Sequence, residues 1–262
     1  IGYLPRSKKA SRNKVTFFVD MTSVSPTPSS LTLKKGPVAS TSSSFGGQSF
    51  VFNIPDDETV SVIESTDSTG TGKLARFTDI DVYEGTLLDK VFTYSSRNPF
   101  QKFILENTGI DLDTLTVKVK SNANSTTAIE YVRQDSLFAE KTGTTITGES
   151  NVYFINEVES ERYELIFGDG IFGKALQDGN VIEASYIVTS GESANGISKL
   201  TYAGRITYNR NSVDYNVTSG ISLISTQGTS SGGEAIESVD SVKKYAPQIY
   251  GTQNRALTAN DY

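Results

Sequence analysis

Short segments of alternating apolar and polar residues, separated by turn signals, recur along this chain and restrict it to a strand-rich fold. In LTVKVK, residues 115–120, a strand would place Leu115, Val117 and Val119 on one face and the two lysines on the other. Val, Ile, Thr, Tyr and Phe, which favour strands, are frequent in such segments. Similar segments are residues 13–21, 48–54, 163–167, 181–188 and 204–209. The pattern predicts a mainly β (α+β) protein.

One segment near the C-terminus has helical spacing instead. It is EAIESVDSVKKYAP, residues 234–247, with acidic residues toward its start and lysines toward its end, as the helix dipole favours. The apolar residues that recur at this spacing are Ile236, Val239, Val242 and Ala246. We expect Pro247 to end this helix, and Thr258 and Asp261 to begin a second one.

These segments suggest an organisation into several parts. We expect a β-sandwich-like domain made of residues 14–102 and 191–230, interrupted by an inserted β-rich or α+β domain of residues 103–190. Residues 1–13 are expected to be a connector from a preceding region, and residues 231–262 a helical C-terminal segment. Because the chain does not begin with Met and stops at TANDY, we expect both ends to be cuts in a longer polypeptide.

A glycine-rich stretch, FGDGIFGKAL, has the letters of a nucleotide-binding loop. Gly168, Gly173 and Lys174 fit G-x-x-x-x-G-K, and Gly168, Gly170 and Gly173 fit G-x-G-x-x-G. A phosphate-binding loop also needs a strand before it and a helix after it. Here a strand-like segment, residues 181–188, follows the turn residues after the loop, which leaves no room for that helix.

The chemistry of the stretch also argues against phosphate. Ala175 stands where a hydroxyl should hold magnesium, and Asp169 would repel an anion. The His-Arg-Asp and Asp-Phe-Gly motifs of kinases are absent as well. We therefore expect a hairpin whose glycines adopt positive φ, with Asp169 bonding the local backbone, and no nucleotide.

The composition excludes several classes of function. The chain has no Cys, His or Trp, so disulfides, thiol–imidazole zinc sites and catalytic triads with a histidine base are impossible. The net charge of −6 argues against broad nucleic-acid binding. No window approaches the about 20 apolar residues that span a bilayer. The basic residues of the first segment are Arg6, Lys8, Lys9, Arg12 and Lys14. A phosphate-binding arm and a solvated connector both explain them, and the missing aromatic platform favours the connector.

Carboxylates gather in four places, residues 55–58, 79–84, 111–113 and 157–164. Two such groups could form a glycosidase acid–base pair or bind calcium, but exposed strand faces and turns explain them more simply. Asn124 and Asn216 fit glycosylation acceptors without any secretory context. The Tyr and Phe residues are expected in the core, with a fraction serving as interface anchors. We propose no catalytic residue, no cofactor-binding residue and no metal ligand.

Two stretches resemble the baseplate J-like family, whose members are wedge components of contractile phage tails and related injection machines. The first is residues 152–196, which contains FGDGIFGK, and the second is residues 231–262. The family pattern in the second is a double glycine, an acidic-Ser helix, Ala-Pro, Gln-x-Arg-Ala, Thr and Asp-Tyr. It is matched by Gly232, Gly233, Glu237, Ser238, Lys243, Ala246, Pro247, Gln253, Arg255, Ala256, Thr258, Asp261 and Tyr262.

The resemblance covers most of the chain and is greatest to the wedge components that build the inner baseplate ring of T-even-type phages. It implies a structural, non-enzymatic subunit of the virion tail baseplate, assembled in the host cytoplasm. Its partners would be copies of itself, in a dimer or ring, and other wedge proteins, through interfaces that rearrange on contraction. The residues alone leave open an alternative function, a carbohydrate-binding or adhesin β-sandwich module, with or without glycoside hydrolase activity.

Overall fold

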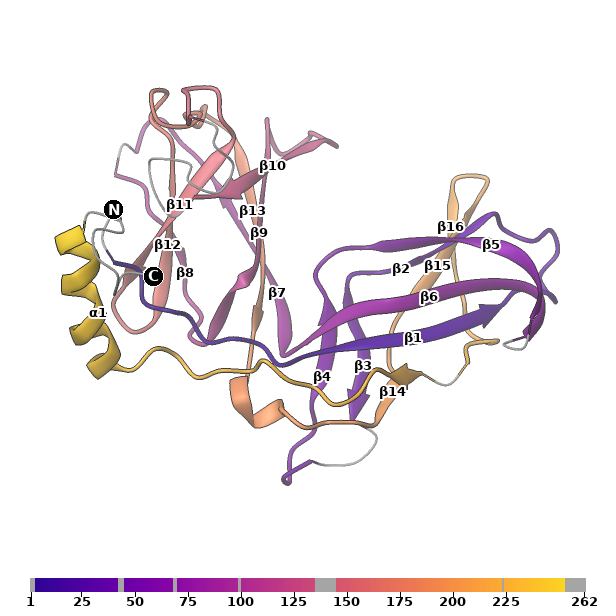
Figure 1. Ribbon diagram of the computed structural model, residues 1–262. Coiled ribbons are helices and arrows are strands. Elements are labelled where there is room, and N and C mark those ends of the chain that lie inside the picture. Colours follow the sequence, from indigo (N-terminus) through magenta and orange to yellow (C-terminus); the bar gives the residue numbers. More distant parts are fainter. Residues whose placement is uncertain are drawn as a thin grey trace. The chain divides into compact units, whose positions relative to one another are not determined.

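A computed structural model describes residues 3–41, 45–67, 70–98, 100–134, 145–222 and 224–252 (Figure 1). Strands make up 51% of the chain and helix 6%, which confirms the predicted mainly β fold with a helical C-terminal segment. The chain divides into two compact units. Unit 1 contains residues 1–8, 89–185 and 235–262, and unit 2 contains residues 9–88 and 186–234. The domain boundaries expected at 103 and 190 differ from these, because this part of unit 1 also takes in residues 89–102 and ends at residue 185.

Unit 2 is a ten-stranded sheet wrapped around one core (Figure 1). Its strands are β1 (Arg12–Asp20), β2 (Ser30–Leu33), β3 (Gly36–Thr41), β4 (Val51–Ile54), β5 (Glu58–Asp67), β6 (Gly70–Glu84), β14 (Leu200–Tyr202), β15 (Ile206–Arg210), β16 (Val213–Asn216) and β17 (Ser225–Thr226). Their order is β14-β3-β4-β6-β5-β2-β15-β16, with β1 paired to β6 and β17. Phe17 of β1 and Phe77 of β6 stack at 4.9 Å in a core that also includes Leu33 of β2.

Unit 1 is built on a seven-stranded sheet. Its strands are β7 (Thr86–Thr93), β8 (Phe103–Leu105), β9 (Ile110–Lys120), β10 (Ala128–Arg133), β11 (Val152–Val158), β12 (Arg162–Phe167) and β13 (Val181–Val188), in the order β7-β13-β9-β10-β11-β12-β8. The unit boundaries fall inside β7 and β13. In β9, Leu115, Val117 and Val119 are buried and the lysines are partly exposed, as the alternation predicted.

Aromatic side chains make much of the core of unit 1. Phe103 of β8 contacts Phe167 of β12 edge to face at 5.6 Å, and Tyr131 of β10 contacts the same ring at 5.7 Å. Such pairs contribute beyond the area they bury. The expectation that most aromatic residues pack inside is confirmed for these strands.

The C-terminal helix α1 (Val239–Thr252) begins later and ends later than its sequence pattern predicted. Residues 234 and 237 are extended instead, because their backbone amides donate to the carbonyl oxygens of Lys9 and Arg6. Ser238 caps the helix by accepting from the backbone N–H of Ser241 at 3.3 Å. The prediction that Pro247 ends the helix was wrong, since Pro247 lies inside it. The second helix expected at residues 258–261 lies outside the described residues.

Candidate functional site

The glycine loop, residues 168–174, has its backbone donors already engaged. The carboxylate of Asp169 accepts from the N–H groups of Ile171 (2.8 Å) and Phe172 (2.9 Å). The N–H of Gly170 donates to the carbonyl of Gly173 at 3.0 Å, and those of Gly173 and Lys174 donate to the carbonyls of residues 147 and 150. A phosphate nest needs such N–H groups to point at the ligand. The loop is therefore bonded as a closed turn.

Two details of the predicted turn chemistry are confirmed. Gly170 and Gly173 both have φ of +90°, which side chains rarely adopt, whereas the expected positive φ is not found at Gly168. Asp169 does bond the local backbone, and these hydrogen bonds, first from Phe172 and then from Ile171, lower the pKa of its carboxyl. The absence of nucleotide binding stays a prediction.

The hairpin expected around this loop was wrong. The preceding strand β12 pairs with β11 and β8, whereas the following strand β13 lies on the far side of β9, β10 and β11. The loop is a connection between strands that are not neighbours. The sequence showed two strands and a turn, but which strands pair is decided by contacts distant in sequence.

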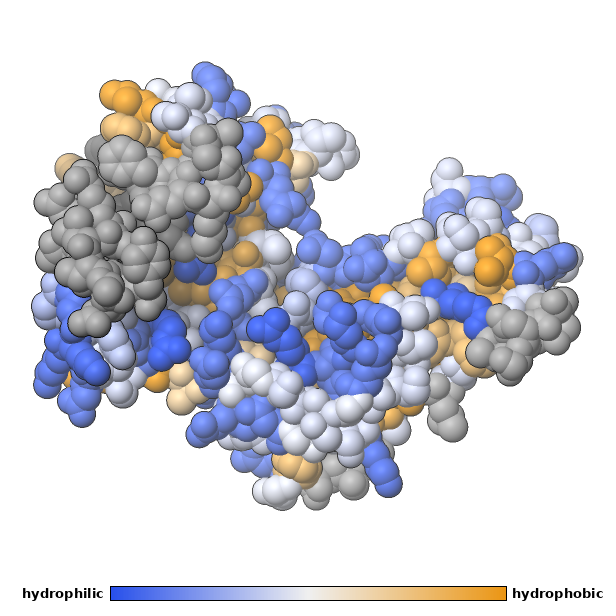
Figure 2. Space-filling view, viewed as in Figure 1, coloured by the Kyte–Doolittle hydropathy of each residue, from blue (hydrophilic) through white to orange (hydrophobic). Residues whose placement is uncertain are grey.

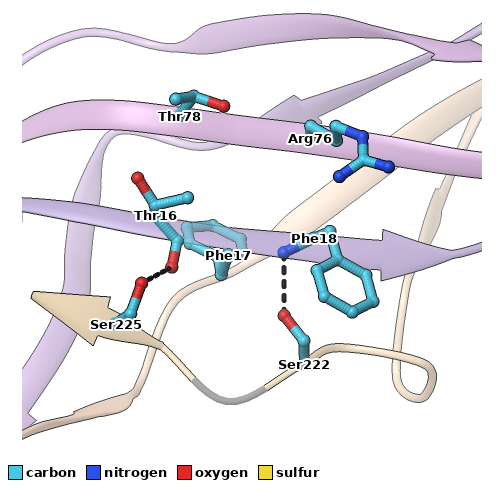
Figure 3. A pocket seen from close by; sticks show the side chains of 7 residues that line it. All are labelled: Thr16, Phe17, Phe18, Arg76, Thr78, Ser222 and Ser225. Atoms are coloured by element: carbon cyan, nitrogen blue, oxygen red, sulfur yellow. Dashed lines mark hydrogen bonds between the residues drawn. The ribbon is translucent and has the colours of Figure 1, made fainter. Parts of the chain in front are cut away.

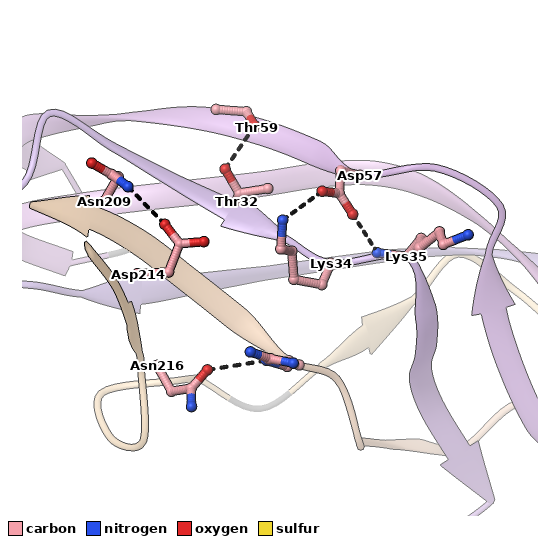
Figure 4. A network of polar contacts seen from close by, with 9 residues as sticks. Thr32, Lys34, Lys35, Asp57, Thr59, Asn209, Asp214 and Asn216 are labelled. Carbon is pink, nitrogen blue, oxygen red and sulfur yellow. Dashed lines mark hydrogen bonds and ion pairs between the residues drawn. The ribbon is translucent and has the colours of Figure 1, made fainter. Parts of the chain in front are cut away.

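Carboxylates of the four clusters contact other parts of the same chain, and the expectation that they lie on exposed faces and turns is wrong for Glu84 and Asp111, each 3% exposed. In unit 2, the carboxylate of Asp57 accepts from the Lys34 ammonium and from the backbone N–H of Lys35, both at 2.7 Å (Figure 4). Burial raises the pKa of Asp57, but these hydrogen bonds outweigh it and leave the pKa lowered. Glu84 is only 3% exposed, and it accepts from the Thr189 hydroxyl at 2.6 Å and the Ser190 N–H at 3.1 Å.

The carboxylates of unit 1 are likewise used by their neighbours. Asp111 accepts from the N–H of Asp113 at 2.9 Å, and Glu164 lies 3.7 Å from the ammonium of Lys102. Burial, followed by the charge of Glu161, raises the pKa of Glu157. Within the residues that the structure describes, no cluster of three or more acidic side chains could hold a metal ion.

The basic arm is built into the fold through its backbone. Lys9 pairs with Glu234 and Arg12 pairs with Ser231 as antiparallel bridges in unit 2. In unit 1, the N–H of Arg6 donates to the Glu237 carboxylate at 3.0 Å. These contacts give residues 6–12 a structural role that their charges did not reveal.

Two residues that carry the family resemblance, Glu237 and Gly233, hydrogen-bond to segments distant in sequence. In unit 1, Glu237 accepts from the Tyr3 hydroxyl at 2.7 and 2.9 Å and from the Ser241 hydroxyl at 2.5 Å. In unit 2, Gly233 and Asn195 exchange two hydrogen bonds of 2.9 Å. A Cβ on Gly233 would lie 2.4 Å from the carbonyl oxygen of Gly191, so only glycine fits. Residues 253–262, which hold the rest of the motif, lie outside the described residues.

A pocket of about 200 Å³ lies beside β1 in unit 2 (Figure 3). Its lining residues are Thr16, Phe17, Phe18, Arg76, Thr78, Ser222 and Ser225. Ser222 accepts from the backbone N–H of Phe18 at 2.8 Å, and Ser225 donates to the carbonyl of Thr16 at 3.2 Å. Arg76 donates to Ser65 at 2.8 Å. No acidic residue lines the pocket, so it lacks the carboxylate pair of a glycosidase.

The β15–β16 hairpin carries a tyrosine pair that the sequence did not single out, in which Tyr215 is exposed and Tyr208 is partly buried against the unit 2 core. Tyr208 and Tyr215 stack across the strands at 5.5 Å, and the Arg210 guanidinium lies 5.5 and 6.0 Å from the two rings. On the other face, Asn209 donates to Asp214 at 2.8 Å (Figure 4). The sequence does contain a signal for this hairpin, because apolar and polar residues alternate in residues 206–210 and 213–216 on either side of Asn211 and Ser212.

Other exposed apolar side chains are spread over both units. On the face seen in Figure 2, apolar groups lie among hydrophilic ones. The largest exposed fractions belong to Phe100, Ile171, Val239 and Val132. The two glycosylation acceptors, Asn124 and Asn216, are also exposed, the first in a turn and the second in β16.

The fold and these surfaces define a mainly β protein of two units whose described polar clusters bind the chain to itself. Neither a protein-family model nor a curated protein matches this chain. No helix in the described parts of the chain is long and apolar enough to cross a membrane.

Proposed function

We propose that this chain is a structural part of a contractile phage tail baseplate, in the wedge or inner ring, and acts through protein–protein interfaces that rearrange on contraction. The proposal includes its location in the virion, assembly in the host cytoplasm, and partners that are copies of itself and other wedge proteins. It includes no catalytic residue and no nucleotide.

The observation that carries the proposal is that Gly233 and Glu237 hydrogen-bond to segments distant in sequence. Both belong to the motif that resembles baseplate J-like proteins, and both hold segments distant in sequence together. The Glu237 carboxylate has three kinds of donor within the chain, which leaves little capacity for a substrate. Such a motif fits a protein that works by its shape and its contacts.

Electron microscopy tests the proposal. The polypeptide that contains this chain would be co-expressed with the other wedge proteins of the same virus, and we expect wedges or rings. Glu237→Ala should weaken their assembly because it removes the hydrogen bonds that Tyr3 and Arg6 donate to this carboxylate. Glu130→Ala, which changes an exposed residue of β10, is the matched control. Particles that form without this polypeptide would refute the proposal.

A carbohydrate-binding or adhesin module is the second candidate, and the exposed Tyr215 ring favours it. The only nearby acid of the hairpin, Asp214, lies on the opposite face from this ring, so the glycosidase version lacks a paired carboxylate there. A glycan array decides the matter, because binding that Tyr215→Ala abolishes would support this candidate over the structural one.

A further inference from the structure

The outer edge of β16 has backbone groups with no strand beside them in the described part of the chain. β16 ends the strand order of the unit 2 sheet and pairs only with β15. The N–H of Val217 donates to the carbonyl of Ile206 at 2.9 Å, which fixes 206/217 as a hydrogen-bonded pair. Because such pairs alternate in an antiparallel ladder, the N–H and C=O groups of Asp214 and Asn216 point away from β15. Figure 1 shows the turn of this hairpin projecting from the neighbouring strands.

The two faces of the edge differ in chemistry. Tyr215 and Val213, 44% and 52% exposed, lie on one face with their cross-strand partners Tyr208 and Arg210. Asp214 and Asn216 lie on the other face. An exposed amphipathic edge of this kind is a template for another strand.

The side chains on the polar face have complementary capacity left over. Asp214 uses Oδ1 to accept from Asn209, and Asn216 uses Oδ1 to accept from the Nε of Arg205 at 3.0 Å (Figure 4). The contact with Arg205 orients the Asn216 amide so that its Nδ2 donors face elsewhere. An Asp214 Oδ2 and an Asn216 Nδ2 could therefore bond each other across an interface.

We propose that two copies of this chain pair antiparallel through β16, around a two-fold axis at Tyr215. In this register Asp214 lies opposite Asn216 of the second copy, and the reverse, so the outward backbone groups of both strands are bonded. Tyr215 meets Tyr215 of the second copy on the apolar face. The inference does not depend on the baseplate proposal, since it uses the edge strand alone.

The charge of Asp214 and the amide of Asn216 favour a second copy of this chain as the partner of β16, and they favour one register of pairing. Moving the axis to residue 214 would place the two Asp214 carboxylates directly opposite each other, which is unfavourable. Moving it to residue 216 would leave Asp214 without the Asn216 amide. Only the axis at Tyr215 pairs every outward polar side chain, which is why a second copy fits this edge. Two four-residue strands bury less than the about 1,200 Å² of a stable interface, so the isolated dimer should be weak.

Cysteine cross-linking tests the register, because the chain has no other thiol. In the proposed pair the two residues 215 are a non-hydrogen-bonded pair, with Cα atoms about 4.5 Å apart, within disulfide range. Tyr215→Cys should therefore form a disulfide-linked dimer under mild oxidation. Val213→Cys is the matched control: it is on the same strand and face and more exposed, but its two copies would be roughly 13 Å apart. Equal cross-linking of the two variants, or none of Tyr215→Cys, would overturn the proposal.

Substitutions that change the charge at positions 214 and 216 test the proposed Asp214–Asn216 pair. Dimerisation of each variant is measured by analytical ultracentrifugation. Asn216→Asp places like charges opposite each other twice and should weaken dimerisation by on the order of tenfold. Adding Asp214→Asn restores an Asp–Asn pair on each side and should restore the dimer, while contacts to Arg205 and Asn209 remain possible. A dimer indifferent to Asn216→Asp would show that the copies meet elsewhere. If the unchanged chain forms no such dimer while baseplates still assemble, this inference alone is refuted.

Discussion

At the scale of single residues, the glycine loop shows how backbone angles and donors decide the chemistry of a motif. Gly168 is there because a Cβ would lie 2.1 Å from the backbone of Gly173, whereas Gly170 is there because of its φ. Asp169 occupies the N–H groups that phosphate would need. A sequence that fits a nucleotide-binding loop therefore forms a turn that the carboxylate of Asp169 stabilises.

Gly170→Val should destabilise the protein by on the order of 1 kcal/mol or more. A Cβ at this position meets nothing closer than 3.9 Å, so the loss would come from the φ of +90° and not from a clash. Denaturant unfolding measures it. Gly170→Asn is the control, because Asn tolerates positive φ and should lose less. Equal midpoints for wild type and Gly170→Val would contradict the strain argument.

Lys174→Ala should leave the response to ATP and GTP unchanged, with no binding before or after the change. Lys174 lies 3.9 Å from the exposed carboxylate of Glu149, and its own N–H is bonded to Ser150. Isothermal titration calorimetry is the measurement. Micromolar binding by the wild type that is lost in Lys174→Ala would show that the loop opens for nucleotide.

At the scale of elements, the start of α1 is set by residues 6–9, which pair with the backbone just before the helix. Residues 234–238 contain helix-compatible residues, yet their backbone pairs with residues 6–9. Each pairing satisfies backbone donors that a first helical turn would leave free. The helix therefore begins at Val239, after the cap by Ser238.

The contact between Tyr3 and Glu237 should depend on pH at both ends of the range. Burial and then the hydrogen bond to Glu237 raise the pKa of Tyr3 from 10.0 to about 12. Burial raises the pKa of Glu237, but hydrogen bonds, first from Ser241, outweigh it and lower the pKa from 4.5. Tyr3, whose pKa is raised, contributes stability to the folded state below pH 10.0, and this contribution is lost as pH rises through about 12. Glu237, whose pKa is lowered, contributes stability above pH 4.5, and this contribution is lost as pH falls further.

Glu237→Gln should accordingly move the pKa of Tyr3 back toward 10.0, because the negative charge is removed while an acceptor remains. Nuclear magnetic resonance of tyrosine labelled at the hydroxyl-bearing ring carbon follows this group separately. Glu130→Gln serves as the control and should leave Tyr3 unchanged. Identical titration of Tyr3 in both variants would show that burial alone shifts it.

At the scale of the whole molecule, unit 2 has a core of its own although two separate stretches of chain build it. Its buried cluster draws Phe17, Phe52 and Phe77 from the first stretch and Leu200 and Ile206 from the second. All the members of that cluster lie within residues 9–88 and 186–234. A unit with a contiguous core can in principle fold alone.

Residues 9–88 joined to 186–234 by a short linker should therefore fold cooperatively. β7 and β13 are neighbours in their sheet, so a short linker from Leu88 to Tyr186 can close the gap. Urea unfolding followed by circular dichroism is the measurement. Residues 9–88 alone are the control and should not fold, because they lack Leu200 and Ile206. A linked chain without a cooperative transition would show that unit 2 needs residues 89–185.

Self-association of the chain should survive salt. The net charge of −6 opposes it, so apolar area and backbone hydrogen bonds must hold the copies together. Exposed charges are screened beyond about 10 Å at 0.1 M salt, whereas apolar contacts are not. Light scattering at low and at several-fold higher salt is the measurement. A dimer that dissociates at high salt would mean that charge holds it.

The sequence by itself identified six of the strand segments and the direction in which the side chains of one of them face, while strands such as β5 and β6 were not recognised. Alternation in 115–120 placed Leu115, Val117 and Val119 inside, because successive side chains of any strand point to opposite faces. The same local logic gave the turn at Asp169 and Gly170, whose bonds span only three residues.

Only the tertiary structure decided which strands are neighbours and what the polar residues contact. Strands β12 and β13 adjoin in sequence but not in the sheet. Glu84 is buried, and its carboxylate accepts from Thr189, more than one hundred positions away. The edge of β16 is likewise a property of the assembled sheet. Pairing and burial are sums over contacts between distant residues, which no local pattern contains, and that is why they had to be read from the folded chain.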